Sequence, residues 1–137
     1  YRSNLPLPFR GEQRATSTAI YFLLHDDVVS HLHRIDADEG WFWHGGGALR
    51  VHVFDDEGYR ALDLGMDIES GQRPQHVVPA GAWFGAEVIG GEGHVLVSCT
   101  VAPGFEFKHF ELANLTDALS AWPEHETLIR RITLSAP

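Results

Sequence analysis

The sequence predicts an all-β fold, an antiparallel jelly roll or small barrel, that ends in two short helices. About eight short segments rich in β-branched and aromatic residues follow one another along the chain. Turn sequences rich in glycine, proline and aspartate separate these segments. Helical spacing of apolar residues appears only near the end of the chain. Short strands divided by turns are typical of jelly rolls and barrels.

The four strands expected in the first half follow from their side chains and from the turns between them. Residues 17–24 are β-branched, aromatic and apolar, as in a mostly buried strand. Residues 30–35 and 39–44 form two further strands, joined by the short polar segment 36–38. Three glycines at 45–47 then allow a turn. Residues 49–54 alternate between an apolar face and a face that carries His52, so they predict a fourth strand.

Four more strands are expected in the second half. The acidic turn 55–58 ends in Gly58, which adopts a positive φ without strain, and this predicts a hairpin to residues 59–64. Strands at 75–78 and 83–89 flank the tight turn 79–81. The glycine-rich turn 90–93 leads to a strong central strand at 94–101.

Two short helices are expected after these strands. Residues 114–122 begin with the capping residue Asn114 and stop before Pro123. Residues 124–132 carry apolar side chains at helical spacing. No linker, repeat or low-complexity tract divides the chain, so we expect one domain over residues 1–137.

Composition and charge exclude several classes of partner. The 137 residues are 44% hydrophobic and 21% charged, which is typical of a globular protein. Ten basic against 19 acidic residues give a net charge of −9, so neither nucleic acid nor a membrane is expected as a partner. No apolar run approaches the roughly 20 residues of a membrane helix. The single cysteine fits a reducing compartment, and we expect a cytoplasmic protein.

The candidate site for chemistry lies in residues 31–39. His31 and His33 are two residues apart on an expected strand, so both imidazoles point to one face. Glu39 follows a short turn and can face the same way. Two imidazoles and a carboxylate inside a barrel suit Zn, Mn, Fe or Ni, so these three residues are candidate ligands of one divalent transition metal.

Two other interpretations of the same residues remain open. Without a metal, His33 is the candidate general base, with Glu39 holding it in one tautomer. In the alternative without function, His33 and Glu39 form a buried pair that only joins two strands, and His31 lies at the surface. Cys99 is expected to be an inert thiol in the core, on the opposite face of its strand from His94.

These segments resemble the cupin superfamily. Its first motif, HxH followed by Glu and Gly, is similar to residues 31–40, and its second, PxGxxH, is similar to residues 79–84. More closely, the chain resembles the fifth cupin subfamily, long described as a domain of unknown function, through residues 1–3, 17–24 and 99–105 followed by Phe107 and Phe110. The resemblance implies a double-stranded β-helix, the cupin jelly-roll barrel, and a homodimer. It also implies a missing N-terminal strand, because subfamily members usually begin with a further segment.

The chain departs from the cupin motifs at three points. Phe84 stands where metal-binding cupins carry their last histidine, and a phenylalanine cannot bind a metal. The spacing from His33 to Glu39 is one residue longer than usual. His31 restores an HxH pair that the subfamily lacks. A metal would therefore take a further ligand from water, substrate, Gln75 or His94.

The resemblance implies a pocket inside the barrel for a small polar metabolite. Its expected ligand-binding residues are Trp41, Trp43, Gln75, Trp83, Phe84 and His94. Three functions remain open: isomerase or epimerase-like acid–base chemistry, as in the sugar-nucleotide epimerases that the fold resembles; a metal-dependent oxygenase or decarboxylase; and non-catalytic ligand binding. No basic cluster comparable to the diphosphate grip of those epimerases is recognisable in the sequence.

Overall fold

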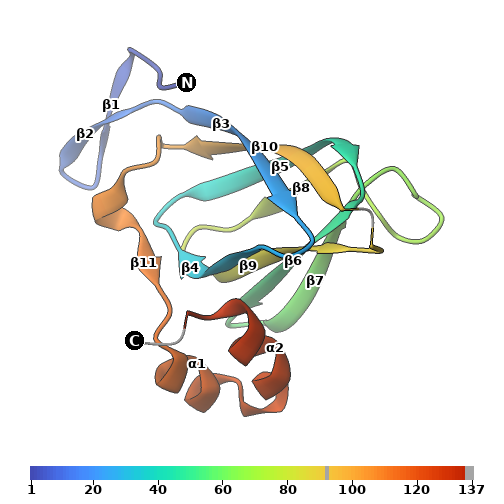
Figure 1. Ribbon diagram of the computed structural model, residues 1–137. Coiled ribbons are helices and arrows are strands. Elements are labelled where there is room, and N and C mark those ends of the chain that lie inside the picture. The colour runs from blue at the N-terminus through green and yellow to red at the C-terminus, as the bar shows by residue number, and fades with distance from the viewer. Residues whose placement is uncertain (92, 135–137) are drawn as a thin grey trace.

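The strands form two facing sheets and a separate N-terminal hairpin in the computed structural model, which describes residues 1–91 and 93–134 (Figure 1). The strands are β1 (Pro6–Phe9), β2 (Glu12–Ala15), β3 (Thr18–His25), β4 (Val29–Arg34), β5 (Asp38–Gly46), β6 (Ala48–Asp55), β7 (Gly58–Leu64), β8 (Gln75–Val78), β9 (Trp83–Ile89), β10 (His94–Ala102) and β11 (Glu111–Leu112). The helices are η1 (Phe107–His109), α1 (Leu115–Ala121), η2 (Pro123–His125) and α2 (Glu126–Ile132).

The predicted antiparallel jelly roll is confirmed, as a barrel that stays open on one side. One sheet has the strand order β3-β10-β5-β8 and the other β11-β4-β9-β6-β7. All eight expected strands are present. The sequence missed β1, β2 and β11, because β1 contains two prolines, β2 is mostly polar and β11 has two residues. Of the turn expected at 90–93, Glu92 lies outside the described residues.

The main core fills the space between the two sheets. Leu49, Val51 and Val53 of β6 are fully buried there, and Val95 and Val97 of β10 face them from the other sheet. These are alternate residues, as the period of two along a strand requires. Packing at one end of the barrel therefore fixes which face of each strand points inward at the other end.

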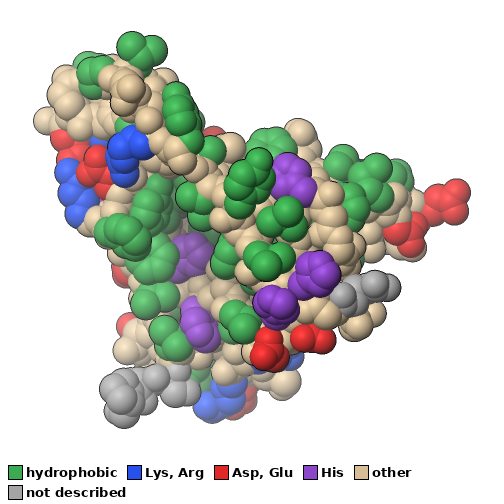
Figure 2. All heavy atoms as spheres, turned by 45° about the horizontal axis from the view of Figure 1, so that its top comes forward, with side chains coloured by type: hydrophobic (Ala, Val, Ile, Leu, Met, Phe, Trp, Pro, Cys, Tyr) green, Lys and Arg blue, Asp and Glu red, His purple; other side chains and the backbone are tan. Residues whose placement is uncertain are grey.

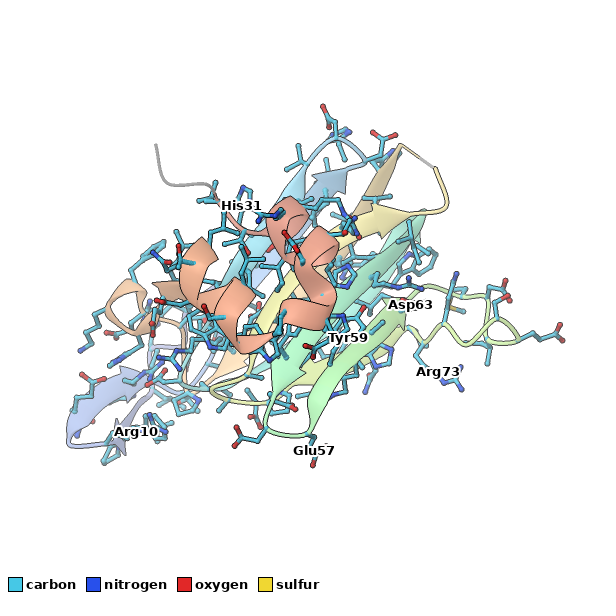
Figure 3. The ribbon with its side chains drawn as sticks, turned by 90° about the horizontal axis from the view of Figure 1, so that it is seen from below. Arg10, His31, Glu57, Tyr59, Asp63 and Arg73 are labelled. Carbon is cyan, nitrogen blue, oxygen red and sulfur yellow. The ribbon has the colours of Figure 1, made fainter. Side chains whose placement is uncertain are left out.

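The outer face of β6, which carries His52, is also buried. Helices α1 and α2 cover this face of the five-stranded sheet (Figure 3, seen from below, with the helices in front). His52 lies 2.9 Å from the Tyr59 hydroxyl and 3.0 Å from Glu87, and Arg131 of α2 bonds the same carboxylate. His52 therefore belongs to a polar cluster that attaches α2 to the sheet.

Both predicted helices are confirmed. The Asn114 side chain accepts hydrogen bonds from the backbone N–H groups of Thr116 and Asp117, which caps α1. Pro123 follows directly and begins η2. Ile129 and Ile132 of α2 are fully buried against the sheet. None of the described helices has the length and apolar character that crossing a membrane would require.

Candidate functional site

A cavity of about 760 Å³ occupies the open side of the barrel. Strands β3, β4, β5 and β10 form its walls, and the N-terminal residues and the segment from Phe105 to Leu112 form its mouth. In Figure 2, histidine side chains are seen between hydrophobic side chains at a hollow in the surface. The polar residues of the lining are Arg2, Thr18, Ser30, His31, His33, Glu39 and Cys99.

Strand register brings the polar residues of the cavity together. In the pairing of β5 with β10, Glu39 lies opposite Val101 and Trp41 lies opposite Cys99, and all four line the cavity. On the other sheet, His31 and His33 of β4 both line it. The prediction that His31, His33, Glu39 and Trp41 face one interior is therefore consistent with the cavity lining.

The His33 imidazole is held in one tautomer and one orientation. Its Nδ1 lies 2.7 Å from the backbone carbonyl oxygen of His31. A carbonyl oxygen only accepts, so Nδ1 carries the proton and Nε2 keeps its lone pair. The ring lies between Phe84, at a centroid distance of 4.2 Å, and Phe110, at 5.0 Å. Burial lowers the pKa of His33, which favours the neutral, basic form.

Glu39 does not have the role that the sequence suggested for it. No hydrogen bond joins Glu39 to His33 among the described residues, and the His31 carbonyl fixes the tautomer instead. The Glu39 side chain is almost completely buried, and burial raises its pKa to about 7 although a hydrogen bond from Cys99 opposes the rise. At neutral pH a large share of Glu39 is therefore a carboxylic acid that can donate a proton.

Cys99 is buried in the main core, as predicted, and it also lines the cavity. It lies on the inner face of β10, as expected, but this face forms core at one end of the barrel and cavity at the other. Burial and the neighbouring Glu39 raise the pKa of the Cys99 thiol, so it stays protonated. Its role at this site is to donate a hydrogen bond to Glu39.

Two buried polar atoms at the cavity have no hydrogen-bond partner among the described residues. They are Nε1 of Trp41 and Nδ1 of His31. Trp41 is only 1% exposed, so water does not reach its N–H freely. Buried donors without a partner are rare in proteins, and a bound molecule, water or ion is one explanation of them. A molecule in the cavity can supply that partner, since both residues line it.

Three of the expected ligand-binding residues are structural. The Trp43 N–H donates to the Gly47 carbonyl oxygen at 2.9 Å and so braces the glycine turn. Trp83 packs against the helices on the outer side of its sheet. Phe84 pairs with His33 in the register of β4 and β9 and is buried behind it. Phe84 thus contacts and supports the His33 imidazole, but it does not line the cavity.

The other two, Gln75 and His94, lie on the outside of the barrel. Gln75 is exposed at the start of β8. His94 is exposed beside His25, with their ring centroids 6.1 Å apart. Alternation on β10 places its odd-numbered residues inside, so the even-numbered face that includes His94 points outward. The assignment of these two residues to the pocket differs from their places in the structure.

The candidate metal ligands share the cavity but do not form a ligand set. Among the described residues, no three His, Cys, Asp or Glu side chains gather closely enough to hold a metal ion. The Nδ1 atom of His33 is already bonded to a backbone carbonyl oxygen. In this arrangement His31, His33 and Glu39 do not fit a metal site of three protein ligands, and the metal hypothesis stays a prediction.

Sequence reasoning missed the residues that form the mouth of the cavity. Tyr1 and Arg2 line it from the N-terminus, and Phe105, Phe107 and Phe110 line it from the segment that follows β10. The ring centroids of Phe105 and Phe107 are 5.0 Å apart. The signal was present in residues 101–105 and the two phenylalanines after them, which marked the family resemblance without indicating a place in the fold.

Comparison with known proteins identifies similar sequences and folds. The sequence model of the family described as Cupin superfamily (DUF985) matches residues 1–113. A hypothetical protein of Leishmania major is 35% identical with a TM-score of 0.91, and the match covers 98% of this chain and 86% of that one. A protein of Shewanella oneidensis is 36% identical with a TM-score of 0.90, covering 99% and 84%.

A more distant structure shares the fold alone. A dTDP sugar isomerase of Desulfovibrio desulfuricans is 14% identical with a TM-score of 0.60, and the match covers 82% of each chain. No curated protein matches the chain.

Proposed function

The chain belongs to the fifth cupin family (DUF985), and from this membership and the cavity geometry we propose that it is an enzyme of the isomerase or epimerase type. It binds a small molecule in the barrel and moves a proton on it. The observation that carries the proposal is the state of His33, whose Nδ1–H is bonded to a backbone carbonyl, leaving Nε2 as a neutral base.

Glu39 supplies the second half of the proton transfer. An isomerase that moves a proton needs a base that removes it and an acid that returns one at another position. Burial lowers the pKa of His33 and so favours its neutral form, while it raises the pKa of Glu39 to about 7 and so favours the protonated acid. Two titratable groups in one cavity whose environments favour opposite states are typical of acid–base catalysis.

The similarity to a sugar isomerase supports the proposal at the level of fold. That neighbour, which shares the barrel, is a dTDP sugar isomerase by its name. Because folds of this class carry many unrelated chemistries, the neighbour does not indicate the substrate. We therefore infer the reaction class from the states of His33 and Glu39.

Exchange of hydrogen with solvent tests the proposal without a known substrate. We expect the protein, incubated in D₂O with a panel of small carbonyl compounds, to replace hydrogen by deuterium at the carbon next to the carbonyl. Proton NMR would show this as loss of the C–H signal. Removal of the base in His33→Gln should slow the exchange about 100- to 10,000-fold.

His94→Gln is the matched control for this experiment. His94 is exposed on the outer face of β10, so its replacement should leave the exchange rate unchanged. A melting temperature of His33→Gln within about 5 °C of the wild type would show that lost exchange is not lost folding. Saturable binding of a panel member without any exchange would contradict the enzyme and indicate a non-catalytic binding protein.

A second copy of the chain is the partner that we propose for β3. This strand is at the edge of its sheet, and its first residues are covered by backbone bonds from Ser3 N–H to Ser17 O and from Ala19 N–H to Tyr1 O, both 2.9 Å. The backbone groups of Tyr21 and Leu23 point to the same edge by alternation. Their side chains are 80% and 52% exposed.

The occupant follows from the charge pattern. Residues 17–24 contain no charged side chain and no proline, the usual protections of an edge strand. A strand can pair antiparallel with its own copy about a twofold axis. Because each chain carries a net charge of −9, two copies meet most favourably on an uncharged surface such as this one.

Sedimentation velocity tests the dimer. We expect a dimer for the wild type and a monomer for Leu23→Lys, which places a charge on the β3 edge. Val77→Lys is the control, because Val77 is 54% exposed on β8 at the opposite edge of the same sheet. It should remain a dimer. A monomeric wild type, or dissociation only in the Val77 variant, would contradict this interface.

A further inference from the structure

We propose that the cavity takes an uncharged molecule with an apolar body and one carbonyl group, and that it excludes phosphorylated metabolites. This inference rests on the proposed function, since it names the substrate class of the same site. This substrate class differs from the small polar metabolite that we expected from the sequence. Three features of the cavity carry it: the walls, one buried donor at the inner end, and the pairing of the positive charge at the mouth.

The walls are apolar almost throughout. Phe22, Ile35 and Val101 line the interior, and Phe105 and Phe110 line the mouth. A sugar turns hydroxyl groups to every side, and each would need a partner when removed from water. Most of this surface offers none. An aryl or alkyl body, in contrast, gains by covering such walls.

The exposure of the walls points to the same occupant. Ile20 is 57% exposed and Phe107 is 82% exposed, although both line the cavity. Contiguous exposed apolar surface of this kind is uncommon in soluble proteins and marks binding sites. A body that fills the cavity would remove both side chains from water.

The inner end offers a hydrogen-bond donor that lacks an acceptor. Trp41 is 1% exposed, and its Nε1–H has no partner among the described residues. An indole N–H only donates, so the missing partner is an acceptor such as a carbonyl oxygen. Glu39, two residues away on β5, adds a second donor when protonated. A carbonyl held here would also make the neighbouring C–H acidic enough for His33 to remove its proton.

No unpaired lysine or arginine is present in the described part of the lining to bind a phosphate. Among the described lining residues, Arg2 is the one lysine or arginine, and it lies at the mouth with its side chain 52% exposed. Its guanidinium donates to the Phe105 carbonyl oxygen at 2.7 Å and lies 3.6 Å from Glu106. A phosphate dianion in this apolar interior would lose its hydration without gaining a counter-ion.

Ligand-observed NMR with defined probes tests the substrate class. The probes are acetophenone, propiophenone and 2-hexanone, with fructose 6-phosphate as the phosphorylated carbonyl compound. We expect saturation transfer from the protein to at least one ketone and none to fructose 6-phosphate. Trp41→Phe keeps the apolar bulk but loses the N–H, so the ketone should bind about three- to tenfold more weakly.

Trp83→Phe is the matched control, because Trp83 packs on the outer side of the barrel and its loss should leave ketone affinity unchanged. Should Trp41→Phe fail to fold, Glu39→Leu serves instead: it removes the second donor and keeps a side chain of similar bulk, so the ketone should bind more weakly. The inference would be overturned by any of three results: fructose 6-phosphate binds, none of the three ketones binds, or Trp41→Phe leaves the ketone affinity unchanged. Ketone binding without deuterium exchange would contradict the proposed isomerase function but not the substrate class. Deuterium exchange on fructose 6-phosphate would contradict the substrate class but not the isomerase function.

Discussion

Glu39→Gln should raise the free energy of unfolding at pH 8 by about 3 kcal/mol and leave it nearly unchanged at pH 4. The pKa of Glu39 is about 7 in the folded protein, against an ordinary value of 4.5 for the unfolded chain. Each tenfold difference in proton affinity corresponds to about 1.4 kcal/mol, which gives the expected size. Glutamine has nearly the same shape and never ionises, so it avoids the cost of a buried carboxylate.

The pH dependence follows from which state holds the proton. Between pH 4.5 and about 7, the unfolded chain has released the Glu39 proton while the folded protein still binds it. The folded state then binds more protons, so the Glu39 contribution to stability falls as pH rises and is constant above pH 7. Glu39→Gln lacks this loss of stability. The difference in free energy of unfolding between the variant and the wild type should therefore increase from pH 4.5 to about 7.

Urea unfolding of wild type and variant at pH 4, 5.5, 7 and 8 would measure this difference. Glu69→Gln, at an exposed position, is the control and should change stability by less than about 0.5 kcal/mol at any pH. Parallel pH profiles for the wild type and Glu39→Gln would show that burial does not hold the Glu39 proton. The proposed acid catalyst would then lose its physical basis.

If Glu39→Gln is more stable but loses activity, Glu39 is present in the apolar cavity for catalysis and not for stability. Glu39 is 9% exposed, and its hydrogen-bond partner among the described residues is the thiol of Cys99. Packing alone would be better served by an amide or an apolar side chain. A carboxyl group that destabilises the fold near neutral pH is understandable where its proton is used.

The strands could be predicted from sequence because each carries its own signal. Alternation, β-branched residues and glycine turns are local features, and they fixed the eight longer strands of the two sheets. The same local logic placed His31, His33, Glu39 and Trp41 on interior faces. It could not find β1, whose prolines argue against a strand until β2 pairs with it.

Period-two alternation states which residues share a face, but not which face looks inward. The odd-numbered face of β10 is apolar and the even-numbered face is mixed. The sequence analysis assigned the mixed face with His94 to the pocket and the apolar face with Cys99 to the core. In a barrel, core and cavity lie on the same side of a strand, so Cys99 belongs to the core and also borders the cavity, while His94 faces the solvent. The residues at the mouth of the cavity could not be predicted for another reason. Residues about 100 positions apart, such as Arg2 and Phe105, come into contact only after the sheets have formed.

The buried Arg14 should be the side chain on which the mouth depends most. Arg14→Met should lower the free energy of unfolding by about 3 to 5 kcal/mol, because it leaves a largely buried carboxylate without its partner. Arg14 is 1% exposed, and its Nη1 lies 2.8 and 2.7 Å from the two carboxylate oxygens of Asp36. Its Nε donates to the Gly104 carbonyl oxygen at 3.1 Å. One side chain therefore ties β2 to the β4–β5 turn and to the segment after β10.

The same carboxylate provides its own control. Arg10 also lies near Asp36, at 3.9 Å, but its side chain is 64% exposed. Exposed ion pairs at such distances contribute little, so Arg10→Met should cost less than about 0.5 kcal/mol in the same urea unfolding measurement. Equal losses for the two variants would mean that charge near Asp36 matters and burial does not. A large loss for Arg14→Met alone would show that the mouth is held by the buried, hydrogen-bonded arginine, because Arg14 bonds both oxygens of Asp36 and the Gly104 carbonyl while Arg10 is exposed and 3.9 Å away.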